Sequence, residues 1–135
     1  LAMFIQGIDD VYQLDWDGVP NDEGGKCYGD IFHRAEVEFS SWNFYHAKTD
    51  MLLGQFRDAE AECGRLLALE TPLALPAYDQ CMKASHLFNL LDARGVISVT
   101  ERAAYIGRVR ALAKGCCEAW ISTADASQKW ETADG

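Results

Sequence analysis

The segment Asn89-Leu90-Leu91-Asp92-Ala93-Arg94-Gly95-Val96-Ile97-Ser98-Val99-Thr100-Glu101-Arg102 decides the fold, because it joins two strong helical patterns through a short corner. Gly95 is a natural helix stop, since glycine alone reaches left-handed dihedral angles without steric cost. Ser98 and Glu101 have the spacing of a capping box, in which each side chain accepts a hydrogen bond from the other residue's amide. The segment therefore predicts one helix that ends near Gly95 and another that begins at about Val99.

Apolar residues recur at spacings of three and four on both sides of this corner, which is the pattern of helices with one buried face. Two further segments with this pattern precede them, one after Asp30 and one starting at Thr49 or Asp50. The connectors are short and no alternating strand pattern occurs. We therefore predict an all-α fold, an antiparallel array of about four main helices. The expected core faces are Phe32, Ala35, Phe39, Trp42 and His46; Leu52, Phe56, Ala59, Cys63 and Leu66; Tyr78, Cys81, Met82, Ser85, Phe88 and Leu91; and Tyr105, Val109, Leu112, Cys116 and Trp120.

Glycine, proline and aspartate residues mark details of these helices. Gly107 and Gly115 each weaken the last predicted helix, from about Val99 to Thr123, by about 1 kcal/mol relative to alanine. We expect them to mark the close approach of a neighbouring helix. Pro76 is expected at the first position of a helix, where its missing amide costs little, and Asp30 as an N-cap.

Charge is unevenly distributed along the chain, which carries a net −9. Residues 1–82 hold five basic and 15 acidic side chains, whereas residues 83–114 hold six basic and two acidic ones. The overall sign argues against indiscriminate nucleic-acid binding, and no DNA partner is expected. The local positive segment leaves room for one specific contact with RNA phosphates or an acidic partner, although charged helix faces in contact with solvent have the same composition.

Five cysteines, Cys27, Cys63, Cys81, Cys116 and Cys117, are present without a Cys-x-x-Cys pair, and three of them fall on apolar faces. This usage is typical of reduced, buried thiols in the cytoplasm. No apolar run is long enough to span a bilayer, and the first residues lack the features of a signal peptide.

Candidate catalytic chemistry is sparse. The three histidines, His33, His46 and His86, do not form an i, i+4 pair, so no metal site is expected. No thiol is marked as activated by a base or a helix N-terminus, and Gly24-Gly25 lacks the other residues of a phosphate loop. From the residues alone, we expect no catalytic residues in this chain.

Several motifs that agree in order and spacing resemble the α subunit of the bacterial, two-subunit type of glycyl-tRNA synthetase. The resemblance extends from Leu1 to about Trp120 and then fades. The strongest motifs are Asn89–Arg94, Ile97–Arg102, Leu1–Tyr12, Tyr28–His33, Asn43-Phe44 and Leu73–Tyr78.

The resemblance implies a division of the chain. Residues 1–14 are expected to end the catalytic domain, at the helix after the third class II motif. Residues 15–29 are expected to form a loop, residues 30–124 the C-terminal helical domain, and residues 125–135 a polar tail. Because the chain begins inside an apparent helix, we expect a fragment without the active site, inactive alone and with no cofactor bound.

The resemblance also implies that the parent attaches glycine to its tRNA in the cytoplasm with ATP and magnesium. The expected partners are glycine tRNA and a β subunit, in an α₂β₂ tetramer without membrane contact. The helical part would lie where the tRNA acceptor end approaches and the β subunit docks. The basic residues that we propose to contact tRNA are Lys83, Arg94, Arg108, Arg110 and Lys114.

Arg102 requires a partner of its own, because it points along the predicted apolar face and an unpaired buried charge is very costly. Asp92, at the end of the preceding helix, is the natural one. We therefore expect a buried structural ion pair that fixes the corner together with Ser98 and Glu101. An RNA contact for Arg102 is the alternative.

Two other interpretations remain open from the sequence. The chain could be a free-standing helical adaptor that binds RNA or protein without catalytic activity, since the helices after Asp30 could close a core alone. It could also come from a related alanyl-type synthetase. The Ser98–Arg102 corner favours the glycyl family, and the apolar Leu1–Gln6 segment argues against the adaptor.

Overall fold

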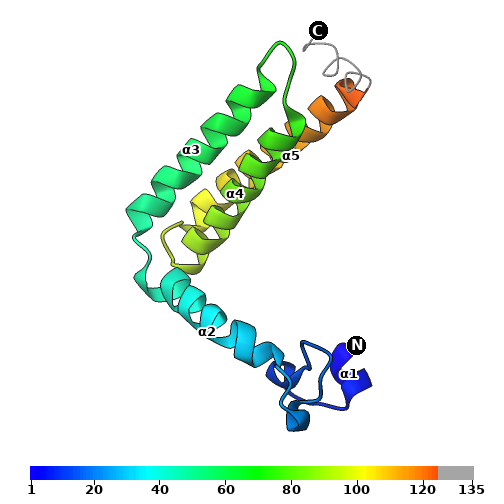
Figure 1. The fold of residues 1–135 in the computed structure, drawn as a ribbon. Helices are drawn as coiled ribbons and strands as arrows, with labels where there is room; N and C mark the ends of the chain where they lie inside the picture. Colours follow the sequence, from blue (N-terminus) through cyan, green and yellow to red (C-terminus); the bar gives the residue numbers. More distant parts are fainter. Residues whose placement is uncertain (125–135) are drawn as a thin grey trace. The chain divides into compact units, whose positions relative to one another are not determined.

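The computed structural model describes residues 1–124, which form two compact units (Figure 1). Unit 1 is Leu1–His46, and unit 2 begins at Ala47. Within the described residues all regular elements are helical, and the only bridge of β type is an isolated one between Asp15 and Cys27. The predicted all-α class with four main helices is confirmed. The elements are α1 (Ala2–Gln6), η1 (Val11–Gln13), η2 (Asn21–Glu23), α2 (Tyr28–Ser41), η3 (Trp42–His46), α3 (Thr49–Leu67), α4 (Ala74–Ala93) and α5 (Val99–Ser122).

The division between the units falls inside the segment 30–124 that the sequence grouped as one domain. Those domain boundaries stay a prediction about the parent protein. The predicted polar tail, 125–135, lies outside the described residues.

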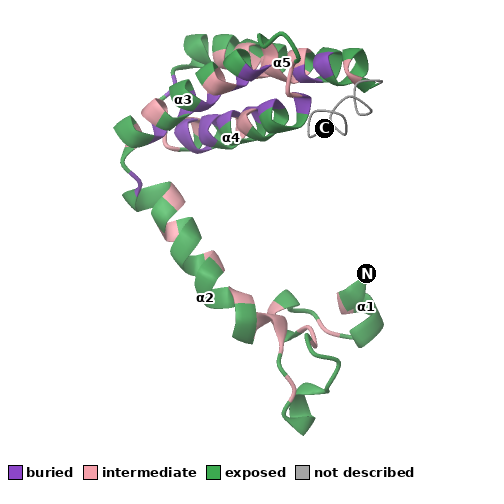
Figure 2. Cartoon of the chain, turned by 45° about the horizontal axis from the view of Figure 1, so that its top comes forward, coloured by how far each residue is buried: buried purple, intermediate pink, exposed green. Residues whose placement is uncertain are grey.

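Unit 2 is a bundle in which α3, α4 and α5 run up, down and up (Figure 1). The buried residues of α3 are Leu52, Phe56, Ala59, Cys63 and Leu66, as the sequence predicts. Their spacing of four, three, four and three places every one on the face that meets the neighbouring helices. The purple positions of Figure 2 follow this face along α3 and its counterpart along α4.

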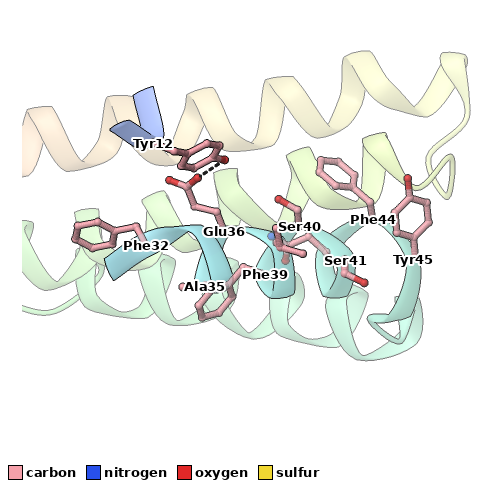
Figure 3. Close-up of a pocket in the computed structure, with 11 residues that line it drawn as sticks. Tyr12, Phe32, Ala35, Glu36, Phe39, Ser40, Ser41, Phe44 and Tyr45 are labelled. Carbon is pink, nitrogen blue, oxygen red and sulfur yellow. Dashed lines mark hydrogen bonds between the residues drawn. The ribbon is translucent and has the colours of Figure 1, made fainter. Parts of the chain in front are cut away.

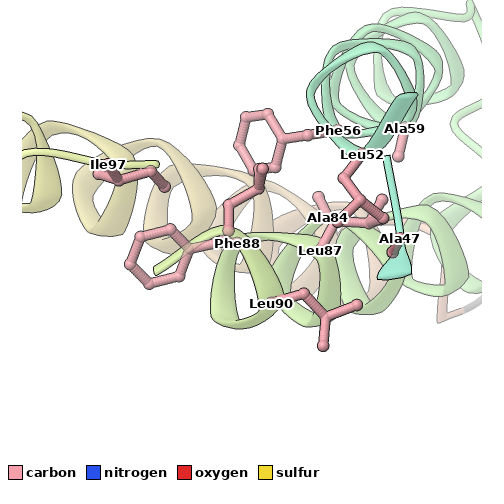
Figure 4. Close-up of a cluster of buried hydrophobic side chains, with 10 residues drawn as sticks. Ala47, Leu52, Phe56, Ala59, Ala84, Leu87, Phe88, Leu90 and Ile97 are labelled. Atoms are coloured by element: carbon pink, nitrogen blue, oxygen red, sulfur yellow. The ribbon is translucent and has the colours of Figure 1, made fainter. Parts of the chain in front are cut away.

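The core of unit 2 consists of two clusters of buried side chains. The larger one surrounds Phe56, Phe88 and Leu91 near the α4–α5 corner (Figure 4). The smaller one contains Cys63, Leu66, Ala77, Cys81 and Cys116. Leu112 of α5 packs against both, so the two clusters form one continuous core.

The predicted core face of α4 is only partly right. Cys81, Phe88 and Leu91 are buried, but Tyr78 and Met82 are 46% and 49% exposed. The real face has a three–four spacing built largely from small residues, whose weak hydrophobicity hides the pattern. Small side chains let the helices approach closely and leave the larger Tyr78 and Met82 at the edge. This face consists of Ala74, Ala77, Cys81, Ala84, Phe88 and Leu91, with Leu87 and Leu90 beside it.

Three smaller expectations about helices are corrected. Pro76 is the third residue of α4, not the first, and still lies in the turn whose amides have no partner in the helix. Gly115 does mark a close approach, because a Cβ there would lie 2.9 Å from Cδ1 of Leu67. Gly107 has open space around it, so that expectation was wrong. Trp120 is 56% exposed rather than part of the core.

Unit 1 has no buried residue in its helices, in contrast to unit 2. The predicted stripe of α2 is helical but not covered, since Phe39 and Trp42 are 67% and 42% exposed. The helix continues into η3, a turn of π-helix. Asp30 does not occupy the N-cap. It lies three residues inside, and its carboxylate accepts from the amide of Cys27, the actual N-cap, at 3.0 Å.

Candidate functional site

The corner between α4 and α5 has the geometry that its sequence predicts. Gly95 adopts a left-handed φ of 68°. The Glu101 amide donates to the Ser98 hydroxyl at 3.2 Å, and the Ser98 amide donates to the Glu101 carboxylate at 3.2 Å. This capping box gives side-chain partners to the amides of Ser98 and Glu101 at the start of α5. The direction of α5 is therefore set by the corner itself.

Asp92 and Arg102 form an ion pair across the corner, with 3.0 Å between Oδ2 and Nη2. The expected burial of this pair was wrong, since the side chains are 27% and 56% exposed. Arg102 lies in the first turn of α5, at the edge of the bundle. Solvent therefore screens this ion pair, and its contribution to stability is small.

The five basic residues proposed to contact tRNA differ in how they are already engaged. Arg94 donates from Nη1 to the carbonyl oxygen of Ala47 at 2.7 Å, which ties the end of α4 to the start of unit 2. Lys83 and Lys114 pair within their own helices, with Asp79 at 2.9 Å and Glu118 at 3.6 Å. These two pairs are more than half exposed, so they are weak and exchange readily with solvent.

Arg108 has the most extensive contacts of the five. Its Nε donates to Glu60 of α3 at 2.7 Å, and its Nη2 donates to the other oxygen of the same carboxylate. The guanidinium carbon also lies 4.9 Å and 4.8 Å from the ring centres of Phe56 and Tyr105. The bond to Glu60 raises the pKa of the Arg108 guanidinium. This arrangement clamps α5 to α3 and commits one edge of the guanidinium to Glu60.

Arg110 is the fifth residue, and it is exposed. No group in residues 1–124 forms a hydrogen bond or ion pair with its guanidinium. Lys114 lies one turn further along the same face of α5. The proposed tRNA contacts therefore separate into Arg94 and Arg108, which hold the bundle together, and Lys83, Arg110 and Lys114, which remain available. The tRNA role of all five stays a prediction.

Unit 1 contains a polar cluster that the sequence pattern does not predict. The Glu36 carboxylate accepts from the hydroxyl of Tyr12 at 2.9 Å and, on its other oxygen, from the hydroxyl of Tyr28. The bonds from Tyr28 and Tyr12 lower the pKa of Glu36, and the bond to Glu36 raises the pKa of each tyrosine. Tyr12 and Tyr28 belong to motifs of the resemblance, which was the available signal. Tyr12 lies 24 residues before Glu36, so its contact could not be predicted from spacing.

Aromatic rings surround this carboxylate and take the place of an aliphatic core. Tyr28 and Trp16 both pack against Phe32, and the centre of each ring lies 4.8 Å from the centre of the Phe32 ring. Tyr12 meets His33 edge-on, with 4.6 Å between the ring centres. On the side of α2 next to this cluster, an open hollow extends along the helix (Figure 3). Its lining includes Tyr12, Phe32, Glu36, Phe39, Phe44 and Tyr45.

Within residues 1–124, no three histidine, cysteine, aspartate or glutamate side chains are grouped so that they could hold a metal ion. None of the helices there combines the length and the apolar character needed to cross a membrane.

Comparison with known proteins identifies the family. A family model described as glycyl-tRNA synthetase alpha subunit matches residues 1–125, which include every described helix. The chain belongs to the glycyl-tRNA synthetase alpha subunit family, a family of aminoacyl-tRNA ligase subunits, as the resemblance implied.

Proposed function

From this family membership, we propose that the chain is the C-terminal helical part of a glycyl-tRNA synthetase α subunit. The parent enzyme would attach glycine to its tRNA with ATP and magnesium during protein synthesis in the cytoplasm. The family match over residues 1–125 is the observation that carries this proposal. The catalytic groups would lie outside this chain, and the helices would form the part that faces tRNA and the β subunit.

The surface of unit 1 supports a place within a larger assembly. Leu1, Phe4 and Tyr45 are 94%, 85% and 76% exposed, and the apolar stripe of α2 is open to solvent. Exposed apolar patches rimmed by polar groups mark protein contacts. In the proposed α₂β₂ enzyme, the rest of the α subunit or the β subunit would cover this surface.

The division among the basic residues supports a narrow contact with tRNA rather than a broad one. Arg110 and Lys114 lie four residues apart on α5, and each could reach one phosphate. Two phosphate contacts predict that log K for tRNA falls with log salt with a slope of about −1.4 to −1.8. Arg110→Ala should reduce that slope by about 0.7 to 0.9, whereas Arg57→Ala, another exposed arginine but on α3, should leave it unchanged.

Two measurements on the purified chain test the proposal. Glycine-dependent exchange of pyrophosphate into ATP should be absent for this chain and present for an intact α subunit mixed with β. Binding of the chain to an immobilised bacterial β subunit should be saturable. Exchange activity in the chain alone would overturn the placement of the active site.

The adaptor alternative is favoured by one observation, that unit 2 closes a core with its own three helices. An adaptor would bind RNA or protein without the β subunit. Saturable RNA binding in the absence of any β-subunit binding would make the adaptor the better interpretation.

A further inference from the structure

Three cysteine side chains from three different helices lie together in the smaller core cluster. Cys63 comes from α3, Cys81 from α4 and Cys116 from α5. The sulfur atoms of Cys63 and Cys116 are 3.8 Å apart, at van der Waals contact. The Cys81 sulfur instead lies 3.9 Å from the carbonyl oxygen of Val109. Cys63 and Cys116 therefore form a facing pair, and Cys81 is engaged elsewhere.

Cys116, which is 3% exposed, borders a groove that opens to the surface, whereas Cys63 does not. An apolar groove of about 440 Å³ lies between the start of α4 and the end of α5, and Cys116 and Cys117 are part of its wall. The rest of the lining consists of Ala74, Leu75, Tyr78, Trp120 and Ile121. Cys63 is completely buried behind Cys116. A small neutral molecule that enters the groove would meet Cys116 before Cys63.

We propose that Cys63 and Cys116 are a redox modification site, at which a small neutral two-electron thiol oxidant forms a disulfide that links α3 to α5. Diamide, an azo dicarboxamide, is a suitable probe. In the first step, the Cys116 thiol adds across the N=N bond, so that an S–N bond forms and the other nitrogen takes the proton. In the second step, Cys63 sulfur attacks Cys116 sulfur, the S–N bond breaks, and the hydrazine leaves with the Cys63 proton.

The environment of the pair predicts a slow reaction. Burial raises the pKa of the Cys63 thiol to about 12, and the neighbouring Cys116 thiol adds to this shift. Because thiolate is the reactive form, the second step proceeds mainly when the bundle opens locally. Cys117 is exposed and does not share this barrier, so it should react first and independently.

The link would close a loop between residues 53 apart in sequence. A cross-link of this length removes conformational entropy from the unfolded chain. Oxidation of a Cys117→Ser variant, in which the competing exposed thiol is absent, should therefore raise the thermal midpoint by on the order of 10 °C. Addition of a reducing agent should return the midpoint to its original value.

Peptide mapping after diamide treatment tests the site directly. The chain is oxidised, denatured, alkylated and digested without reduction, and the linked peptides are identified by mass and fragmented, so that the bond is assigned to Cys116 or to the adjacent Cys117. We expect a Cys63–Cys116 peptide pair in the natural chain and in Cys81→Ser and Cys117→Ser, and none in Cys63→Ala or Cys116→Ala. Recovery of Cys63 and Cys116 as alkylated thiols while Cys117 is oxidised would overturn the proposal, as would a linkage through Cys81. The natural chain gives this result even if a variant fails to fold.

Discussion

The two units of this chain are held together by different interactions. In unit 2, apolar side chains from three helices are removed from water and form a continuous core. In unit 1, no helical residue is buried, and the elements are joined by aromatic contacts and by the hydrogen bonds of Glu36. Burial of apolar surface contributes about 25 cal/mol per Å² and adds up over many side chains, whereas each hydrogen bond contributes only on the order of 1 kcal/mol. Unit 2 should therefore be the stable part of the chain, and unit 1 the part that depends on a partner.

Removing one ring from each unit should give the largest contrast. Phe56 is 1% exposed in unit 2, and Phe56→Ala should lower the free energy of unfolding by about 3–5 kcal/mol, because it removes apolar contacts and leaves a cavity. Phe39→Ala, at a position 67% exposed on α2, should change it by less than about 0.5 kcal/mol. Urea unfolding followed by circular dichroism measures both. Equal losses would mean that α2 is covered as well as α3.

How far the sequence predicts the fold also differs between the units. The face of α3 was predicted completely because Leu52, Phe56 and Leu66 are large and regularly spaced. In α4, Ala77 and Ala84 carry the packing, and alanine is too weakly hydrophobic to stand out in a periodic pattern. In α2 the pattern is strong, yet its face is open, because a hydrophobic stripe indicates that a partner is needed without indicating which one.

The candidate site shows a similar limit. The capping box of Ser98 and Glu101 is local and could be predicted from their spacing. The partners of Arg108 and Arg94 lie 48 and 47 residues away, on elements whose position only the folded bundle defines. A list of basic residues therefore could not separate the two that hold the bundle together from Arg110, which is free within the described residues.

The next contrast compares two ion pairs of α3. Glu60→Gln should cost about 1–2 kcal/mol, because Arg108 would lose a charged, bidentate partner in a partly buried position. Glu62→Gln, which removes a pair with Arg65 on the open side of α3, should cost less than about 0.5 kcal/mol. Chemical denaturation at low and high salt measures the cost of each substitution. Only the cost of Glu62→Gln should depend strongly on salt. Equal costs would contradict the proposed clamp between α3 and α5.

A smaller effect is expected at the corner. Asp92→Asn should reduce stability by no more than about 0.5 kcal/mol, since its pair with Arg102 is open to solvent. Ser98→Ala should cost more, about 1 kcal/mol, because it removes the N-cap of α5. Thermal unfolding of the two variants gives the order. A larger loss for Asp92→Asn would show that the ion pair, and not the cap, fixes the direction of α5.

The last contrast uses acid to perturb unit 1 while unit 2 stays folded. The hydrogen bonds from Tyr28 and Tyr12 lower the pKa of Glu36 below its unfolded value of about 4.3. Their stabilisation is therefore fully present above pH 4.3 and is lost as the pH falls through the folded pKa. Ring resonances of Tyr12 and Tyr28 should shift in this range, while those of Tyr105 in unit 2 should not. Glu36→Gln should remove the transition, and Glu38→Gln, which removes the exposed partner of Arg34, should retain it. If Tyr105 shifted together with Tyr12, the two units would respond as one, and the difference between a hydrogen-bonded unit and an apolar one would not hold.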